Sequence, residues 1–132
     1  MRLAEYILPS DTGAEKPILA VFSGIGGTVD ENINRWYGQF EQPDGSPTAK
    51  SAKRWEVDVR EGISATMVDI RGTFKGGMGP SAGKVRRKFR MLAAIIETRG
   101  TFYHIKLTGL QNEVERFATD FERLIAGLIL SG

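Results

Sequence analysis

A glycine-rich corner is the first stretch of the chain whose residues could bind a ligand. Residues 22–36 read FSGIGGTVDENINRW, an apolar strand that runs into glycines and then into a helix. A Walker phosphate loop needs a lysine and a serine or threonine after its last glycine, and a dinucleotide fingerprint needs a third glycine. The glycine pair at 26–27 is followed by Thr-Val-Asp, so neither pattern is complete.

The same corner carries a helix-capping signal. Thr28 and Glu31 form a T-x-x-E pattern, in which the threonine hydroxyl accepts from the Glu31 amide and the Glu31 carboxylate accepts from the Thr28 amide. Asp30 and Glu31 also supply the negative charge that a helix N-terminus attracts. The sequence therefore predicts a structural corner rather than a phosphate site.

Few other side chains suggest catalysis. The chain has no cysteine, which excludes disulfides and thiolate chemistry, and His104 is its one histidine. A single histidine is too little for a metal site, and the neighbouring Lys106 disfavours a bound cation. Ser23 lies outside a G-x-S-x-G elbow. We predict no catalytic residue, no metal site and no cofactor.

Three carboxylates lie on predicted strands and could form an acid–base pair if two of them converged. They are Asp58, Asp69 and Glu97. Such residues are more often exposed or ion-paired, so a carboxylate-based hydrolase is kept only as an alternative.

A basic run is the strongest binding signal. Residues 75–90 contain no acid and six cations: Lys75, Lys84, Arg86, Arg87, Lys88 and Arg90. A glycine-rich loop over 75–88 that ends in basic residues could contact an acidic protein, a polyanion or a lipid headgroup. The structural alternative is a solvated edge that charge protects from strand pairing. Phe89 is the only aromatic residue in the run, which argues against a nucleic-acid surface.

Hydrophobic periodicity predicts two amphipathic helices and six strands. The first helix, over about 29–40, has its apolar residues on one stripe, and so does the last, over about 114–128. The strands are expected at 2–8, 18–22, 55–59, 63–74, 89–98 and 101–109.

The resulting order is β-β-α-β-β-β-β-α in a single domain, 1–132. Strands joined by short turns pair antiparallel. The strands at 18–22 and 89–98 are apolar on both faces and need cover on both sides. The sequence therefore predicts an α+β fold, a mostly antiparallel sheet of about six strands sandwiched between helices.

Composition fits an ordinary globular domain, with 41% hydrophobic and 26% charged residues and a net charge of +2. No apolar run reaches the roughly 20 residues that a transmembrane helix requires. The N-terminal residues lack the apolar core of a secretory signal. We expect a cytoplasmic protein as written, or a periplasmic or lipid-anchored one if a leader precedes it.

Three stretches together resemble a group of uncharacterised bacterial proteins that are often secreted or lipid-anchored. They are ENINRWYGQFEQPDG (31–45), RMLAAIIET (90–98) and YHIKLTG (103–109). The layout also resembles the fold shared by the extrinsic photosystem II protein PsbP and a yeast Ran-binding import factor. This resemblance implies an α/β/α sandwich and a role in binding or assembly, and it brings no catalytic residue.

The sequence therefore predicts a non-enzymatic binding or accessory protein that contacts a protein or anionic partner through residues 75–90. A small-molecule carrier is an alternative, because Ala93 and Ala94 on the central strand could leave a cavity between sheet and helix. The carboxylate-based hydrolase is the other. The identity of the partner and the oligomeric state stay open.

Overall fold

The computed structural model describes residues 2–10, 13, 15–60, 63–75, 85–98 and 100–131, with side chains except at 58–60 and 128–131. The strands are β1 (Arg2–Ile7), β2 (Ile18–Ser23), β3 (Phe40–Glu41), β4 (Lys53–Arg60), β5 (Ile63–Phe74), β6 (Arg86–Thr98) and β7 (Thr101–Leu110). The helices are α1 (Val29–Tyr37), α2 (Thr48–Ser51), α3 (Gln111–Glu115) and α4 (Ala118–Ser131).

The seven strands form one antiparallel sheet in the order β1-β2-β7-β6-β5-β3, with β4 also paired to β5. The outer edge of β5 is divided between two partners. β4 pairs with residues 63–69, and the two-residue β3 pairs with Thr73 and Phe74. The predicted α+β class and the mostly antiparallel sheet are confirmed.

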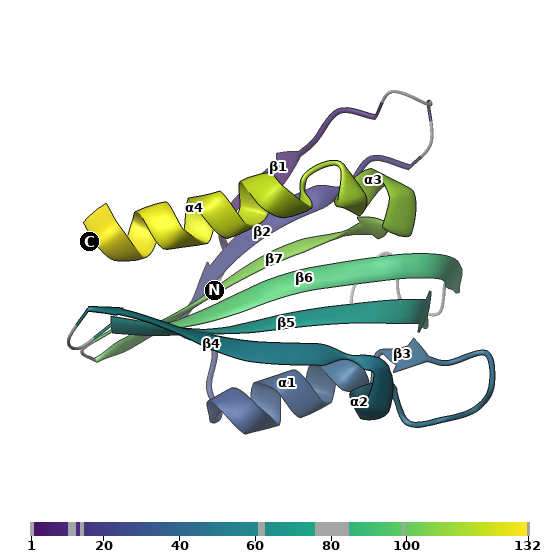
Figure 1. Cartoon of the computed structure of the whole chain (residues 1–132), viewed down its shortest axis with the longest axis horizontal. Coiled ribbons are helices and arrows are strands. Elements are labelled where there is room, and N and C mark those ends of the chain that lie inside the picture. The colour runs from purple at the N-terminus through teal and green to yellow at the C-terminus, as the bar shows by residue number, and fades with distance from the viewer. Residues whose placement is uncertain are drawn as a thin grey trace.

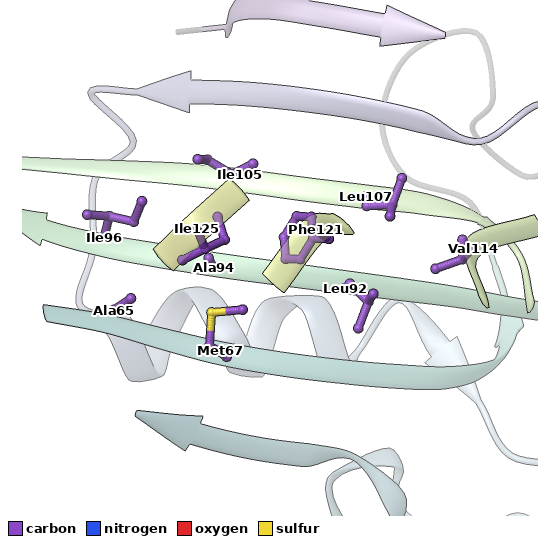
Figure 2. Close-up of a cluster of buried hydrophobic side chains, with 10 residues drawn as sticks. All are labelled: Ala65, Met67, Leu92, Ala94, Ile96, Ile105, Leu107, Val114, Phe121 and Ile125. Atoms are coloured by element: carbon purple, nitrogen blue, oxygen red, sulfur yellow. The ribbon is translucent and has the colours of Figure 1, made fainter. Parts of the chain in front are cut away.

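Helices cover both faces of the sheet, with α3 and α4 on one side and α1 and α2 on the other (Figure 1). Along β6, alternate residues point to opposite faces, so that Leu92 and Ala94 contact the α3–α4 layer and Ala93 and Ile95 contact the α1 layer. Figure 2 shows Phe121 and Ile125 of α4 between that helix and the strands. The predicted cover on both faces is confirmed.

Several predicted boundaries were wrong. The first helix ends at Tyr37, because Gly38 caps it, and Phe40 belongs to β3, where its ring lies 5.3 Å from the Phe74 ring. This short strand brings the number of strands to seven rather than six. The last helix is divided, since α3 ends at Glu115 and α4 begins at Ala118.

The basic run was also misplaced in part. β6 begins at Arg86, so residues 86–88 belong to a strand instead of a loop, with Arg86 paired to Phe74 of β5 and the next two residues in a bulge. Charged side chains on a strand near the end of a sheet can reach solvent, so polarity did not exclude pairing there. Lys84 lies outside the described residues.

The glycine corner has the predicted capping box. The Glu31 amide donates to Thr28 Oγ1 and the Thr28 amide donates to Glu31 Oε1, both at 3.1 Å. The buried Asn32 side chain donates to the carbonyl oxygens of Gly26 and Thr28, at 3.2 and 2.8 Å. The two bonds of the buried Asn32 side chain tie α1 to the backbone of the glycine corner and stabilise the turn.

No helix in the described part of the chain combines the length and apolar composition needed to cross a bilayer.

Candidate anion-binding cleft

A cleft of about 690 Å³ lies where β3, the far end of β5 and the start of β6 meet. The polar residues that line it are Glu41, Gln42, Arg71, Thr73, Arg87, Lys88 and Gln111. The volume falls within the roughly 300–1,000 Å³ of typical ligand pockets. The cleft therefore places Arg87 and Lys88 of the predicted basic run beside Arg71, which lies outside that run in the sequence.

A β-bulge turns the basic residues toward this cleft. Gly72 pairs with Phe89 and Phe74 pairs with Arg86, so Thr73 alone lies opposite both Arg87 and Lys88. An extra residue of this kind bends a strand and re-aims its side chains. Lys88 has a φ of 52° and is the one non-glycine residue with positive φ in the described part of the chain. Such backbone strain is concentrated at functional sites.

Gly72 allows β3 to approach the bulge closely. Its φ is 148°, and a Cβ there would lie 2.6 Å from Gln42 Nε2 and 2.8 Å from the Glu41 carbonyl oxygen. The Gln42 amide donates to the Arg71 carbonyl at 2.9 Å and to Thr48 Oγ1 at 3.2 Å. The wall formed by residues 41 and 42 is thus held against β5 by contacts that only glycine permits.

The cleft carries excess positive charge. Among the described residues, Arg71, Arg87 and Lys88 line it together with one acid, Glu41, whose carboxylate lies 3.8 Å from Lys75. Arg87 and Lys88 form no ion pair with any described residue. Arg71 makes only a long contact of 3.9 Å with Asp69 and is 52% exposed. The cleft therefore presents three cations that an anionic group could bind.

Arg71 was missed by the sequence reasoning. It stands at the end of a strand recognised by its apolar residues, and it lies far from the basic run in the sequence. In the sheet it pairs with Arg90, two residues along β6 from Lys88. Only the β5–β6 register brings these cations together.

Two residues of the basic run have structural partners instead. Arg86 Nε donates to both carboxylate oxygens of Glu15, at 2.7 and 3.0 Å. Arg90 is buried and donates to Asp69 and, at 2.7 Å, to Glu115. Burial alone would lower the pKa of Arg90, but its bonds to the two carboxylates outweigh burial and raise it. Both guanidiniums are thus ion-paired within the chain.

Lys75 follows β5 and lines a second hollow, beside the loop between β3 and α2, that shares Glu41 and Gln42 with the cleft. Its side chain is 42% exposed, and its ammonium lies 3.8 Å from the Glu41 carboxylate. The structure thus brings Arg87 and Lys88 together, places Lys75 at the margin, and assigns Arg86 and Arg90 elsewhere.

The predicted carboxylates are not brought together where their side chains are described. Asp69 pairs with Leu92 on the α3–α4 face and is bound to Arg90. Glu97 pairs with Ser64, five positions along β5, so its side chain lies on the α1 face roughly 17 Å away. The side chain of Asp58 lies outside the description.

Apolar hollows occur on the α3–α4 side of the sheet. One of about 330 Å³ lies among Leu3, Val21, Ile63, Ile96, Tyr103 and Ile105, and another of about 270 Å³ lies beside Phe121. Ala93 and Ala94 are fully buried and are not among the residues that line either hollow. Hollows are therefore present on the α3–α4 face of the sheet, but they do not lie at Ala93 and Ala94, where the sequence predicted a cavity.

Compared with known proteins, the chain matches no family model, no curated protein and no solved structure.

Proposed function

We propose that this protein is a non-enzymatic binding domain that holds an acidic segment of a partner protein in the cleft. The observation that carries the proposal is the bulge, which presents Arg87 and Lys88 without ion-pair partners among the described residues, next to Arg71. Carboxylates and phosphates are the anions that such a set of guanidinium and ammonium groups binds with charge-assisted hydrogen bonds.

The chemistry of the cleft favours an acidic peptide over a nucleic acid. None of the described lining residues is aromatic, whereas single-stranded nucleic acids are bound largely by stacking on aromatic side chains. Gln42 and Gln111 offer amide groups that suit a peptide backbone, and Pro43 and Val85 add apolar surface. Val85 is 63% exposed, so it offers a contact that a partner could cover.

A role in assembly is part of the same proposal. The resemblance to the PsbP-type fold implies binding without catalysis, and an antiparallel sheet with helices on both faces agrees with that layout at the level of architecture. Because a fold does not determine function, the weight of the proposal lies on the cleft.

The proposal is tested by binding of a fluorescent hexaglutamate peptide at low salt. Reversing two cleft charges, Arg87→Glu with Lys88→Glu, should weaken binding at least about tenfold, which is roughly 1.4 kcal/mol. The matched control reverses two exposed lysines away from the cleft, Lys50→Glu with Lys53→Glu, and should change affinity less than about twofold. Equal losses in both variants would show attraction by net charge alone and reject the cleft.

Two further arms identify the partner class. Single-stranded DNA that binds wild type more tightly than hexaglutamate would overturn the assignment to an acidic protein segment. Inorganic phosphate that fails to displace the peptide at constant ionic strength would support the cleft's preference for carboxylates arranged along a chain, and displacement at equal concentration would contradict it.

A carrier of apolar molecules is the second candidate, because the 330 Å³ hollow is lined almost entirely by apolar side chains. Dodecanol is a suitable probe, and native mass spectrometry should detect its complex. Val21→Phe fills the hollow from the half-buried edge and should abolish the complex. Failure of the wild-type protein to bind the probe would remove this candidate.

A further inference from the structure

Lys106 lies in a niche enclosed by three elements. It comes from β7 and is half-buried on the α1 face, where its Nζ lies 5.1 Å from the ring centroid of Phe22 in β2 and 5.4 Å from that of Trp36 in α1. These cation–π contacts favour the ammonium form, while the same rings also shield the amine from water. Neither ring can accept the strong, charge-assisted hydrogen bonds that a carboxylate would.

The charged groups that face Lys106 are cations. Arg35 of α1 and Arg2 of β1 both act on it, and Arg2 also lies 5.4 Å from the centroid of the Phe22 ring. Arg2 contacts Glu5 at 3.2 Å, whereas Arg35 donates to a neutral acceptor, Asn32 Oδ1, at 2.7 Å. Lys106 itself has no ion pair or hydrogen bond with any described residue. Among the described residues, therefore, Arg2 has a carboxylate partner, whereas Arg35 and Lys106 have none.

His104 stands two residues before Lys106 on the same face and is 2% exposed. Its ring meets the Trp36 ring edge to face at 5.5 Å, and its buried Nε2 has no hydrogen-bond partner among the described residues. Burial and the charges of Lys106 and Arg35 lower its pKa to about 4. The imidazole is therefore neutral at physiological pH and leaves the positive charge of the niche to Lys106 and the two arginines.

These surroundings change the protonation of Lys106. Burial, followed by the charges of Arg35 and Arg2, lowers its pKa to about 8. At pH 7.5, roughly a quarter of the molecules would then carry a neutral amine, against about 0.1% for an ordinary exposed lysine. Only the neutral amine is nucleophilic, and desolvated lysines next to other cations are known to be activated in this way.

We propose that Lys106 is a nucleophilic amine that forms an imine with small carbonyl compounds bearing a carboxylate. The neutral Nζ attacks the carbonyl carbon, a C–N bond forms, and proton transfer from nitrogen to oxygen gives a neutral carbinolamine. Loss of that hydroxyl with the remaining N–H proton, as water, leaves the C=N bond. No oxidant is needed. Arg35 and Arg2 attract the carboxylate and hold the carbonyl carbon near Nζ.

Glyoxylate is the probe, with cyanoborohydride to reduce each imine to a stable secondary amine that peptide mass spectrometry locates. At pH 7.5, wild-type Lys106 should be labelled at least about tenfold faster than the exposed Lys16, Lys50 and Lys53. In guanidinium chloride the advantage should disappear, because it depends on the folded niche. Labelling of Lys106 no faster than the exposed lysines in the folded protein would overturn the proposal.

Propionaldehyde tests the role of the carboxylate, since it has the same reactive group without the charge. Arg35→Gln should lower the preference of Lys106 for glyoxylate over propionaldehyde several-fold, while the preference at Lys50 stays unchanged. Arg35 is exposed, and a circular dichroism melt verifies that this variant is folded. Equal labelling of wild-type Lys106 by both aldehydes would reject the anionic substrate class.

The cleft variant Arg87→Glu with Lys88→Glu separates this inference from the proposed function. Its two residues lie outside the niche, so labelling at Lys106 should match that of wild type even when peptide binding is lost. Loss of the Lys106 label in this variant would contradict an independent site.

Discussion

Arg90 and Asp69 form a two-pronged ion pair across β5 and β6, with Nε–Oδ1 and Nη2–Oδ2 distances of 3.0 and 2.9 Å. Their side chains are only 7% and 8% exposed. Glu115 of α3 binds the same guanidinium at 2.7 Å from a position 70% exposed. Through Glu115, Arg90 thereby links the sheet to α3. Because Arg90 is buried in these contacts, one cation of the basic run is not presented at the surface.

Breaking this pair should be costly because the buried Arg90 loses its buried partner and keeps only Glu115, which is 70% exposed. We expect Asp69→Ala to lower the free energy of unfolding by about 3–5 kcal/mol. Glu115→Ala removes a largely exposed partner and should cost less than about 1 kcal/mol. Urea denaturation measures both. The double variant Asp69→Leu with Arg90→Met leaves no orphaned charge and should be more stable than Asp69→Ala, and the reverse order would contradict this account.

The capping box of α1 should contribute about 1 kcal/mol to stability. Thr28→Ala removes the acceptor of the Glu31 amide and should lower the free energy of unfolding by that amount. Thr28→Ser keeps the hydroxyl and should recover most of it. If the serine variant is no better than the alanine variant in urea, the hydroxyl is not the stabilising group.

Among the described glycines with positive φ, Gly72 should be the least replaceable. Gly72→Ala places a Cβ against Gln42 and backbone, so we expect a loss of about 2–4 kcal/mol together with weaker peptide binding in the cleft. Gly24 is the matched control, since its φ is +69° but nothing lies within 4 Å of a Cβ there. Gly24→Ala should cost only about 1 kcal/mol, the penalty of the backbone conformation. Thermal and urea unfolding compare the two, and equal losses would contradict the close approach.

The positive φ of Lys88 should lower the stability of the fold, while its charge should strengthen peptide binding. Asparagine tolerates a positive φ better than lysine, so Lys88→Asn should raise the free energy of unfolding by about 0.5–1 kcal/mol while it weakens hexaglutamate binding. Lys88→Arg retains both strain and charge and should leave both quantities nearly unchanged. A gain in stability with no loss of affinity would show that the charge of Lys88 is not used.

His104 should make the fold sensitive to acid. Its pKa in the folded state, about 4, lies below its ordinary value of 6.5, so the unfolded chain binds more protons between those pH values. Stability should therefore fall as pH drops from 6.5 to 4, by on the order of 2–4 kcal/mol from this residue. His104→Phe keeps an aromatic ring against Trp36 without a titrating group. The difference between the two proteins in urea midpoints across this pH range isolates the histidine, and a constant difference would contradict its burial as a neutral group.

The sequence by itself determined the features that depend on local order. The stripes of 29–40 and 114–128 predicted the helices because a period of 3.6 places apolar residues on one side. Thr28 and Glu31 predicted the cap because the box closes within one turn. The apolar runs at 18–22 and 89–98 predicted a sheet covered on both faces, because such strands have no polar side to expose to water.

Tertiary structure alone determined whether each charge in the basic run is buried, ion-paired or exposed. The carboxylates that neutralise Arg86 and Arg90 come from Glu15 and Asp69, 71 and 21 residues away. Arg71 joins Arg87 and Lys88 only through the register of β5 on β6, and the bulge that exposes them arises from a mismatch between two strands. The sequence alone does not distinguish the cations of the run from one another. Whether each charge is buried, paired or free depends on which distant acid the fold brings within a few ångströms.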